Sequence, residues 1–399
     1  MMKTPYFRTF FSLIGLLFLA FLAAPGQANA GERLTIVYTG GMKGELEPCG
    51  CSPETQSGGL ARLSTYISQN KDKLGPVILV DAGNALAEET PQGRLKSEAM
   101  MRSFGAIGYD AVAFFEKGTP LPLKELKPLL GKKVKVVSDM AGQPGSALIR
   151  KKNIQVNVSV DPKAVKKGRL NVLLTDRKAS EVSAAGWDVV ISSSGEEIKE
   201  PVKTDGAVYV SGYLKGEKLG VLTLELDRKG RVTTYSHRWQ ALGKDVADDP
   251  KVRGILNEYD MKVAELAKAQ EKKPVSEGPY LGAERCMECH QPHYEIWLST
   301  KHSTAFSRLE EVGKSRDPEC VVCHSVGFRE EGGFISREAT PKLANVQCEA
   351  CHGPGREHAK DFSPMRPLGD ATERVCLKCH TPENSPQFDF KEYYERIKH

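Results

Sequence analysis

Eight of the ten cysteines in this chain fall into four copies of one short pattern, Cys-x-x-Cys-His. At this spacing two thiols can add to the two vinyl groups along one edge of a porphyrin, and the adjacent histidine reaches the iron. Zinc sites also use Cys-x-x-Cys pairs, but they need no histidine after every second cysteine. Disulfide frameworks, which are common in exported proteins, need no such repeat either. The pattern therefore predicts four covalently bound haem c groups, attached at Cys286, Cys289, Cys320, Cys323, Cys348, Cys351, Cys376 and Cys379, with His290, His324, His352 and His380 as proximal iron ligands.

A six-coordinate haem iron needs a second axial ligand on its other face. The chain has nine histidines, and all except His237 lie within residues 290–399. After the four proximal ligands, this uneven distribution leaves His302, His358 and His399 as candidate distal ligands. His293 is a further possible distal ligand. It follows His290 by three residues on the proximal side of that haem, so it could serve only a neighbouring iron.

Residues 281–399 offer too little chain to build four separate protein-walled pockets. We therefore expect the porphyrins to pack against one another and to supply much of the apolar core, with few and short helices. Without haem this segment should not fold, as small metal domains unfold without their metal. The aromatic side chains expected to line the haems are Trp297, Phe306, Phe328, Phe334 and Tyr393.

The stretches GAERCMECH, YEIW, STKHSTAF and QCEACHGPGREH carry a family resemblance. Residues 280–399 resemble the tetrahaem cytochrome c family typified by the electron acceptor of hydroxylamine oxidoreductase. The resemblance implies two histidine ligands for most haems, with His302, His358 and His399 at distal positions. It also implies an open face on the haem of Cys320, Cys323 and His324. His293 departs from the family pattern and could fill that face.

The N-terminus has the features of a secretory signal peptide. Lys3 and Arg8 precede a short apolar run at 10–24, and Ala28-Asn29-Ala30 is a small-x-small cleavage site. The alternative is an uncleaved N-terminal anchor. We expect cleavage near Ala30 and a periplasmic or otherwise exported protein, with no membrane span in the mature chain.

Residues 31–240 alternate between strand and helix patterns and predict an α/β domain. Apolar runs at 34–39, 77–81, 187–192 and 219–227 are typical of buried strands, and 58–67 opens a helix. The stretches YTGGMKGELEPCGC, GGLARL, VDAGN and GYDAVAFFEKG resemble calcineurin-like metallophosphoesterases of the 5′-nucleotidase type. That resemblance implies a two-sheet sandwich with a two-metal site.

Several residues depart from the metallophosphoesterase pattern. Gly41 and Lys43 stand where the family has Asp and His, and Glu116-Lys117 stands near its Asn-His pair. We therefore expect a degenerate scaffold without catalytic metals, and we do not expect phosphoesterase activity. Cys49 and Cys51 form a Cys-Gly-Cys pair for which a local disulfide, reduced thiols, or a redox or metal role all stay open.

These patterns predict a multidomain chain. A signal peptide at 1–30 precedes an α/β metallophosphoesterase-like domain at 31–245. An amphipathic helix and linker at 246–280 lead to a mostly helical and loop-rich tetrahaem domain at 281–399.

The favoured function is electron transfer between redox proteins, which could be other c-type cytochromes, a quinol dehydrogenase or a terminal reductase. No nucleic-acid partner is expected. The first alternative is a haem enzyme that reduces or oxidises nitric oxide, hydroxylamine or nitrite at a five-coordinate haem. The second is a binding module in which the α/β half recognises a nucleotide or a partner.

Overall fold

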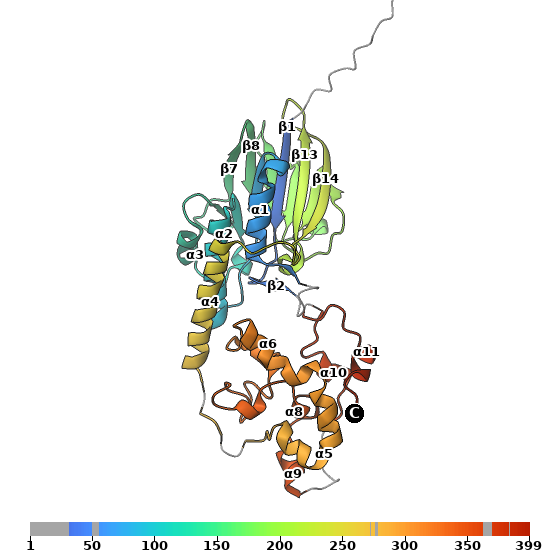
Figure 1. Cartoon of the computed structure of the whole chain (residues 1–399). Coiled ribbons are helices and arrows are strands. Elements are labelled where there is room, and N and C mark those ends of the chain that lie inside the picture. Colours follow the sequence, from blue (N-terminus) through green and yellow to red (C-terminus); the bar gives the residue numbers. More distant parts are fainter. Residues whose placement is uncertain (1–31, 50–55, 272, 276–277, 362–368, 383) are drawn as a thin grey trace, which may run out of the picture. The chain divides into compact units, whose positions relative to one another are not determined.

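The computed structural model describes residues 32–49, 56–271, 273–275, 278–361, 369–382 and 384–399. The expected signal peptide and Cys51 lie outside these residues. Figure 1 shows two parts joined in sequence, an α/β part built on two sheets and a C-terminal part made of short helices and loops. Among the described residues, no helix combines the length and the apolar character needed to cross a lipid bilayer.

The first sheet has six strands, and four of them are parallel. β1 (Glu32–Thr39), β4 (Val77–Asp81), β5 (Ala111–Phe114) and β6 (Lys135–Ser138) pair parallel with one another. Beyond β1, β13 (Lys218–Leu226) pairs antiparallel with β1, and β14 (Val232–Ala241) pairs antiparallel with β13. The parallel pairs are connected through helices, as parallel strands require. The apolar runs at 34–39, 77–81 and 219–227 thus form β1, β4 and most of β13.

The second sheet also has six strands, in the order β11 (Val202–Thr204), β12 (Ala207–Ser211), β10 (Val189–Ser192), β9 (Leu170–Thr175), β8 (Ile154–Ser159) and β7 (Ser146–Lys151). Its four inner strands are parallel, and β7 and β11 pair antiparallel at the edges. A further two-stranded ladder joins β2 (Pro48–Cys49) to β3 (Ser57–Gly58).

Side chains alternate between the two faces of each strand, so β1 contributes to two different cores. Leu34, Ile36 and Tyr38 pack in one buried cluster with residues of the second sheet, including Val172 and Val189. Val37, from the opposite face of β1, packs in the other cluster with the helices. The layers are therefore helices, first sheet and second sheet, which is the sandwich that the sequence predicts.

Four helices cover the outer face of the first sheet: α1 (Leu60–Leu74), α2 (Pro91–Ile107), α3 (Leu123–Leu130) and α4 (Pro250–Ala269). Local signals fix their starts. Thr90 caps α2 through a hydrogen bond from the Gly93 N–H, and Asp249 caps α4 through one from the Val252 N–H. α4 buries its apolar stripe in the same core as α1 and α2. This long helix therefore packs as part of the α/β core.

His237, the only histidine outside residues 290–399, has a structural position in the first sheet. A Cβ atom at Gly220 would lie 2.0 Å from Cζ of Tyr38, so only glycine lets the Tyr38 ring cross β13. The Tyr38 hydroxyl then forms a 2.9 Å hydrogen bond with His237 Nε2 on β14. Burial lowers the pKa of His237.

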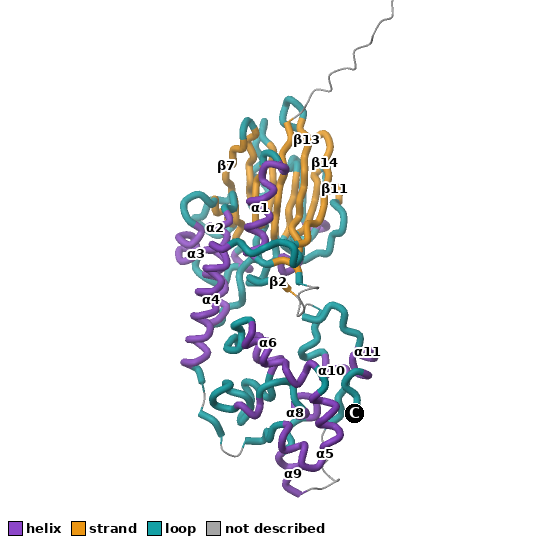
Figure 2. The backbone as a smooth tube through the Cα atoms, viewed as in Figure 1, coloured by secondary structure: helices purple, strands orange, loops and turns teal. Residues whose placement is uncertain are grey.

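The C-terminal region consists of short helices and loops, with no strand among its described residues (Figure 2). Its helices are α5 (Ala283–Leu298), α6 (Ala305–Glu311), α7 (Pro318–His324), α8 (Cys348–His352), α9 (Arg356–Asp361), α10 (Glu373–Cys376) and α11 (Phe390–Glu395). Its buried apolar cluster is small and includes Tyr280, Phe306, Val326 and Phe334. The protein alone supplies little core here, as expected for a segment that packs around haem.

Charged side chains connect the segment before α7 to the α/β part. Lys314 Nζ lies 2.5 Å from Asp260 Oδ1 and 3.6 Å from Glu47 Oε1. Arg253 forms a bidentate pair with the same Glu47 carboxylate. Closer to α7, Gln92 Nε2 donates to Asp317 Oδ1 at 2.7 Å. We call Glu47, Arg253, Asp260 and Lys314 the ionic network.

Candidate haem-binding site

Each of the four motifs lies on a helical turn. The first is in α5, the second ends α7, the third makes up α8, and the fourth begins at the end of α10 and continues into the next turn. Residues three and four positions apart lie on one helix face. The two cysteines of each motif therefore lie on one side of the turn, as attachment along one porphyrin edge requires. The histidine is helical in the second and third motifs, whereas His290 lies at a kink of α5 and His380 follows the turn.

None of the eight motif cysteines is fully buried. Cysteine side chains from different motifs lie together, Cys286 beside Cys348 and Cys323 beside Cys379. The first motif thus adjoins the third, and the second adjoins the fourth.

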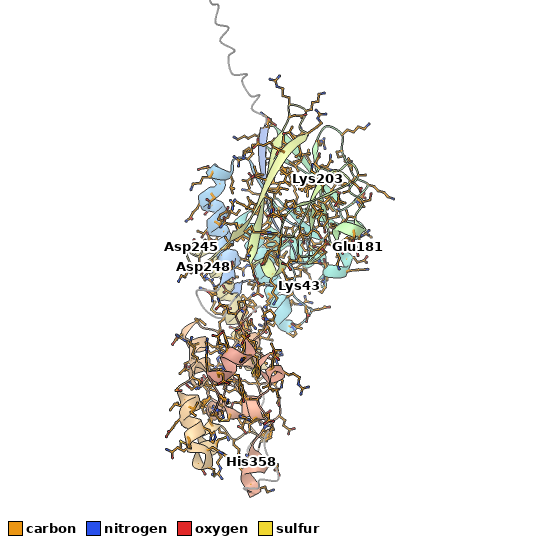
Figure 3. The ribbon with its side chains drawn as sticks, turned by 90° about the vertical axis from the view of Figure 1, so that its right-hand side faces the viewer. Lys43, Glu181, Lys203, Asp245, Asp248 and His358 are labelled. Atoms are coloured by element: carbon orange, nitrogen blue, oxygen red, sulfur yellow. The ribbon has the colours of Figure 1, made fainter. Side chains whose placement is uncertain are left out.

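Three motif histidines lie opposite a second histidine. Ring centroids are 6.1 Å apart for His290 and His358, 5.9 Å for His352 and His399, and 6.2 Å for His380 and His302. Two imidazoles on opposite faces of one iron have centroids about 6 Å apart, because each metal–nitrogen bond is about 2 Å long. The separations therefore fit an iron between the rings. His358 lies on α9, where Figure 3 labels it.

Hydrogen bonds orient the motif histidines. His324 Nδ1 donates to the carbonyl oxygen of Ala305 at 2.6 Å, and His352 Nδ1 donates to that of Gly369 at 2.7 Å. A carbonyl oxygen only accepts, so Nδ1 carries the proton and Nε2 keeps its lone pair. His380 Nδ1 is 3.1 Å from Ser385 Oγ. Such bonds fix the tautomer and ring direction that an iron ligand needs.

The His324 ring has no histidine ring at a comparable separation within the described chain. His293 lies elsewhere, with its ring centroid 5.6 Å from that of His290 and 5.2 Å from that of His399, both nearly perpendicular. It is thus beside the first and third motifs. The structure brings His302, His358 and His399 each to a motif histidine, and it places His293 away from His324.

In the α/β part, two residues of the stretch that resembles the phosphoesterases, Asp81 and Asn84, are hydrogen-bonded to neighbouring protein groups. Asp81 is fully buried, and its carboxylate accepts from Thr39 Oγ1 at 2.7 Å and from the Gly83 N–H at 2.9 Å. Burial raises the pKa of Asp81 to about 7. Asn84 Nδ2 donates to the carbonyl oxygen of Ser193 at 3.1 Å. Within the part of the chain that the structure describes, no three His, Cys, Asp or Glu side chains are grouped to hold a metal.

A cavity of about 540 Å³ opens at the carboxyl ends of β5, β6 and β9. Charged side chains of both signs line it: Glu116, Lys117, Asp139, Asp176, Arg177 and Glu181. Figure 3 labels Lys43 and Glu181 in this part of the molecule. Lys43 adopts a left-handed backbone conformation, with φ of 49°.

Sequence reasoning did not single out Glu349, the second residue of the third motif. It is 3% exposed and bonds only to backbone groups. The sequence signal that could have found it is its position between Cys348 and Cys351, where a haem would cover it. A charged side chain covered in this way needs hydrogen-bond partners.

Comparison with known proteins agrees with this division. Residues 285–353 match the family described as "Cytochrome c554 and c-prime". Cytochrome c-554 of Nitrosomonas europaea is 30% identical over 86 residues, which are 18% of this chain and 37% of that protein. The match thus spans little more than a third of the relative's length.

Among solved structures, a 5′-nucleotidase precursor from Thermus thermophilus has a TM-score of 0.52 at 17% identity. The alignment covers 78% of this chain and 74% of that one. The sulfate thiohydrolase SoxB of Thermus thermophilus has a TM-score of 0.46 at 14% identity, over 63% of each chain. The first likeness shows the fold alone. The chain therefore combines a metallophosphoesterase-like fold with a cytochrome c554-like region, a combination consistent with covalently bound haem c.

Proposed function

We propose that this protein is an exported tetrahaem cytochrome that transfers electrons between redox partners through closely packed haems. The observation that carries the proposal is the set of three histidine pairs at about the separation of two ligands on one iron. In this proposal His290 and His358 ligate the first iron, His352 and His399 the third, and His380 and His302 the fourth.

The chain's own residues hold and orient the haem groups. The motif cysteines supply the covalent attachment, and the carbonyl groups of Ala305 and Gly369 aim the rings of His324 and His352. Bound haem c supplies one-electron redox chemistry. The contact of Cys286 with Cys348 supports close spacing between the haems of the first and third motifs. The contact of Cys323 with Cys379 supports the same for the haems of the second and fourth motifs.

The proposal includes the arrangement of the whole chain. Residues 1–30 are a signal peptide, 31–245 a metallophosphoesterase-like domain without catalytic metals, 246–280 a helix and linker, and 281–399 the tetrahaem domain. The protein works in the periplasm or otherwise outside the cytoplasm. Its partners are other c-type cytochromes, a quinol dehydrogenase or a terminal reductase, and the α/β domain serves as a docking or scaffolding module.

A haem count and low-temperature EPR of the oxidised protein test the proposal. Alkaline pyridine haemochrome spectra should give four haems per chain, and EPR should show three low-spin haems and one high-spin haem. Fewer than four haems would refute the tetrahaem assignment. Four low-spin haems would refute the assignment of an open face at His324.

The second candidate function is an enzyme that reduces or oxidises a small nitrogen compound such as nitric oxide, hydroxylamine or nitrite. It is favoured by His324, whose ring lacks a paired histidine in the described chain. A vacant axial position is what a small ligand needs to reach an iron.

Titration of the reduced protein with nitric oxide tests the enzyme candidate, with turnover followed under a supply of electrons. Binding of one equivalent with turnover would place this function ahead of simple electron transfer. Absence of binding would exclude it.

A further inference from the structure

One carboxylate joins the first and third motifs. Glu349 Oε2 accepts hydrogen bonds from the Gly282 N–H at 2.8 Å and the Leu281 N–H at 3.0 Å. Its Oε1 accepts from the Gly355 N–H at 2.7 Å and again from Leu281 at 3.0 Å. A side chain inside the third motif thus holds the segment that enters α5 and the turn that follows α8.

The neighbouring Gln347 completes this attachment. Its Oε1 accepts from the Ala283 N–H at 2.6 Å, and its Nε2 donates to the carbonyl oxygens of Ala344 and Lys342 at 2.5 and 2.9 Å. The first N–H groups of a helix lack partners within the helix. Gly282, the N-cap residue of α5, has no side chain to supply one. Two side chains from the third motif region therefore cap the helix that carries the first motif.

The charge of Glu349 lies close to the haem attachment points. It is flanked in sequence by Cys348 and Cys351, and its partners precede Cys286 on α5 by only a few residues. Backbone N–H groups donate to both oxygens of the Glu349 carboxylate, which satisfies this buried polar group.

We propose that Glu349 is a positioning residue that fixes α5 against α8 and favours the oxidised form of the haems on the first and third motifs. The inference rests on the proposed function. Adding an electron beside a fixed, poorly screened negative charge costs free energy. Electrons delivered by a redox partner therefore reside preferentially on the haems of the second and fourth motifs, on the side of His324.

The test is a spectroelectrochemical titration of the full-length, haem-loaded protein. Glu349→Gln keeps the side-chain size and removes the charge. At a fixed ambient potential, the ratio of reduced to oxidised haem should rise about tenfold for two of the four haems, a shift of 59 mV for a one-electron couple. Glu284→Gln is the matched control. Glu284 lies in the first turn of α5 but is exposed, so solvent screens its charge and the titration should be unchanged.

A second variant provides a test if Glu349→Gln cannot be obtained as a folded, haem-loaded protein. Glu349→Asp retains the charge and shortens the reach, so it should melt at a lower temperature and titrate like the wild type. The inference would be overturned if Glu349→Gln titrated like the wild type. It would also be overturned if Glu349→Asp changed the ratio of reduced to oxidised haem tenfold. A wild-type haem count below four would instead refute the proposed function, independently of either variant.

Discussion

The imidazole rings of His290 and His358 lie 6.1 Å apart with an interplanar angle of 25°. His290 belongs to the first motif on α5, whereas His358 lies on α9, which follows the third motif in the sequence. This separation fits two ligands on opposite faces of one iron. His293 lies beside the same ring, with centroids 5.6 Å apart and an interplanar angle of 71°.

Replacing His358 with alanine should leave the first haem without its second axial ligand. We expect one further high-spin haem in the EPR spectrum of the oxidised variant, with the haem count unchanged because the attachment cysteines are intact. His293→Ala is the control and should retain the wild-type spectrum. A new high-spin signal in His293→Ala, with none in His358→Ala, would reverse the two assignments.

Replacing His302 with alanine should open the haem of the fourth motif, because His302 is the ring paired with His380. Carbon monoxide binds reduced haem only at a vacant axial position. The reduced wild type should therefore bind one equivalent and His302→Ala two, measured by optical titration. Equal stoichiometry in both proteins would contradict the pairing of His302 with His380.

Lys314→Ala should destabilise the protein by roughly 2 kcal/mol, between the values for exposed and for buried ion pairs, because it leaves two half-buried carboxylates without their shared cation. The side chains of Lys314, Glu47 and Asp260 are 17, 26 and 22% exposed. Denaturant unfolding of the holoprotein measures the change. Arg308→Ala removes the exposed Arg308–Glu311 pair and should have no measurable effect. Equal stability of both variants would mean that the ionic network contributes nothing.

Asp81 should make the α/β domain less stable as the pH rises. Burial raises its pKa from 3.8 to about 7, so the folded state holds a proton that the unfolded state releases. The contribution is fully present below pH 4 and is lost as the pH rises through about 7. A difference of one in pKa between the folded and unfolded states corresponds to about 1.4 kcal/mol, which predicts a loss of a few kcal/mol.

Asp81→Asn removes this titration. As the pH rises from about 4 to about 8, the unfolding free energy of the wild type should fall relative to that of Asp81→Asn. Chemical denaturation at the two pH values measures it. A difference independent of pH would show that Asp81 is ionised throughout, despite its burial.

The sequence predicts the features that depend on neighbouring residues. The apolar runs at 34–39 and 77–81 have the length and composition of buried strands, and β1 and β4 occupy them. Cys-x-x-Cys-His is equally local, and the stretches around it, such as YEIW and STKHSTAF, indicated the family whose model matches residues 285–353. Departures such as Gly41 and Lys43 were visible because they change residue types at fixed places in known stretches.

Long-range partners could not be assigned in this way. Which motif faces His302 depends on how the chain folds between α5 and the fourth motif, and no periodicity records it. Phe306 and Phe334 were expected to line haems, and the structure packs them against each other with centroids 4.9 Å apart. The role of Glu349 likewise depends on backbone N–H groups from a distant segment. Such contacts are set by tertiary structure.

The order of the paired histidines along the chain has a consequence for biogenesis. His302 precedes the fourth motif, so the last haem would find its second ligand already synthesised and exported. His358 follows the third motif, so the first haem would wait, with one face uncovered, until most of the chain had crossed the membrane. Maturation would then proceed through a sequence of half-ligated intermediates, and of the three haems with paired histidines the first would be exposed longest to external ligands and oxidants.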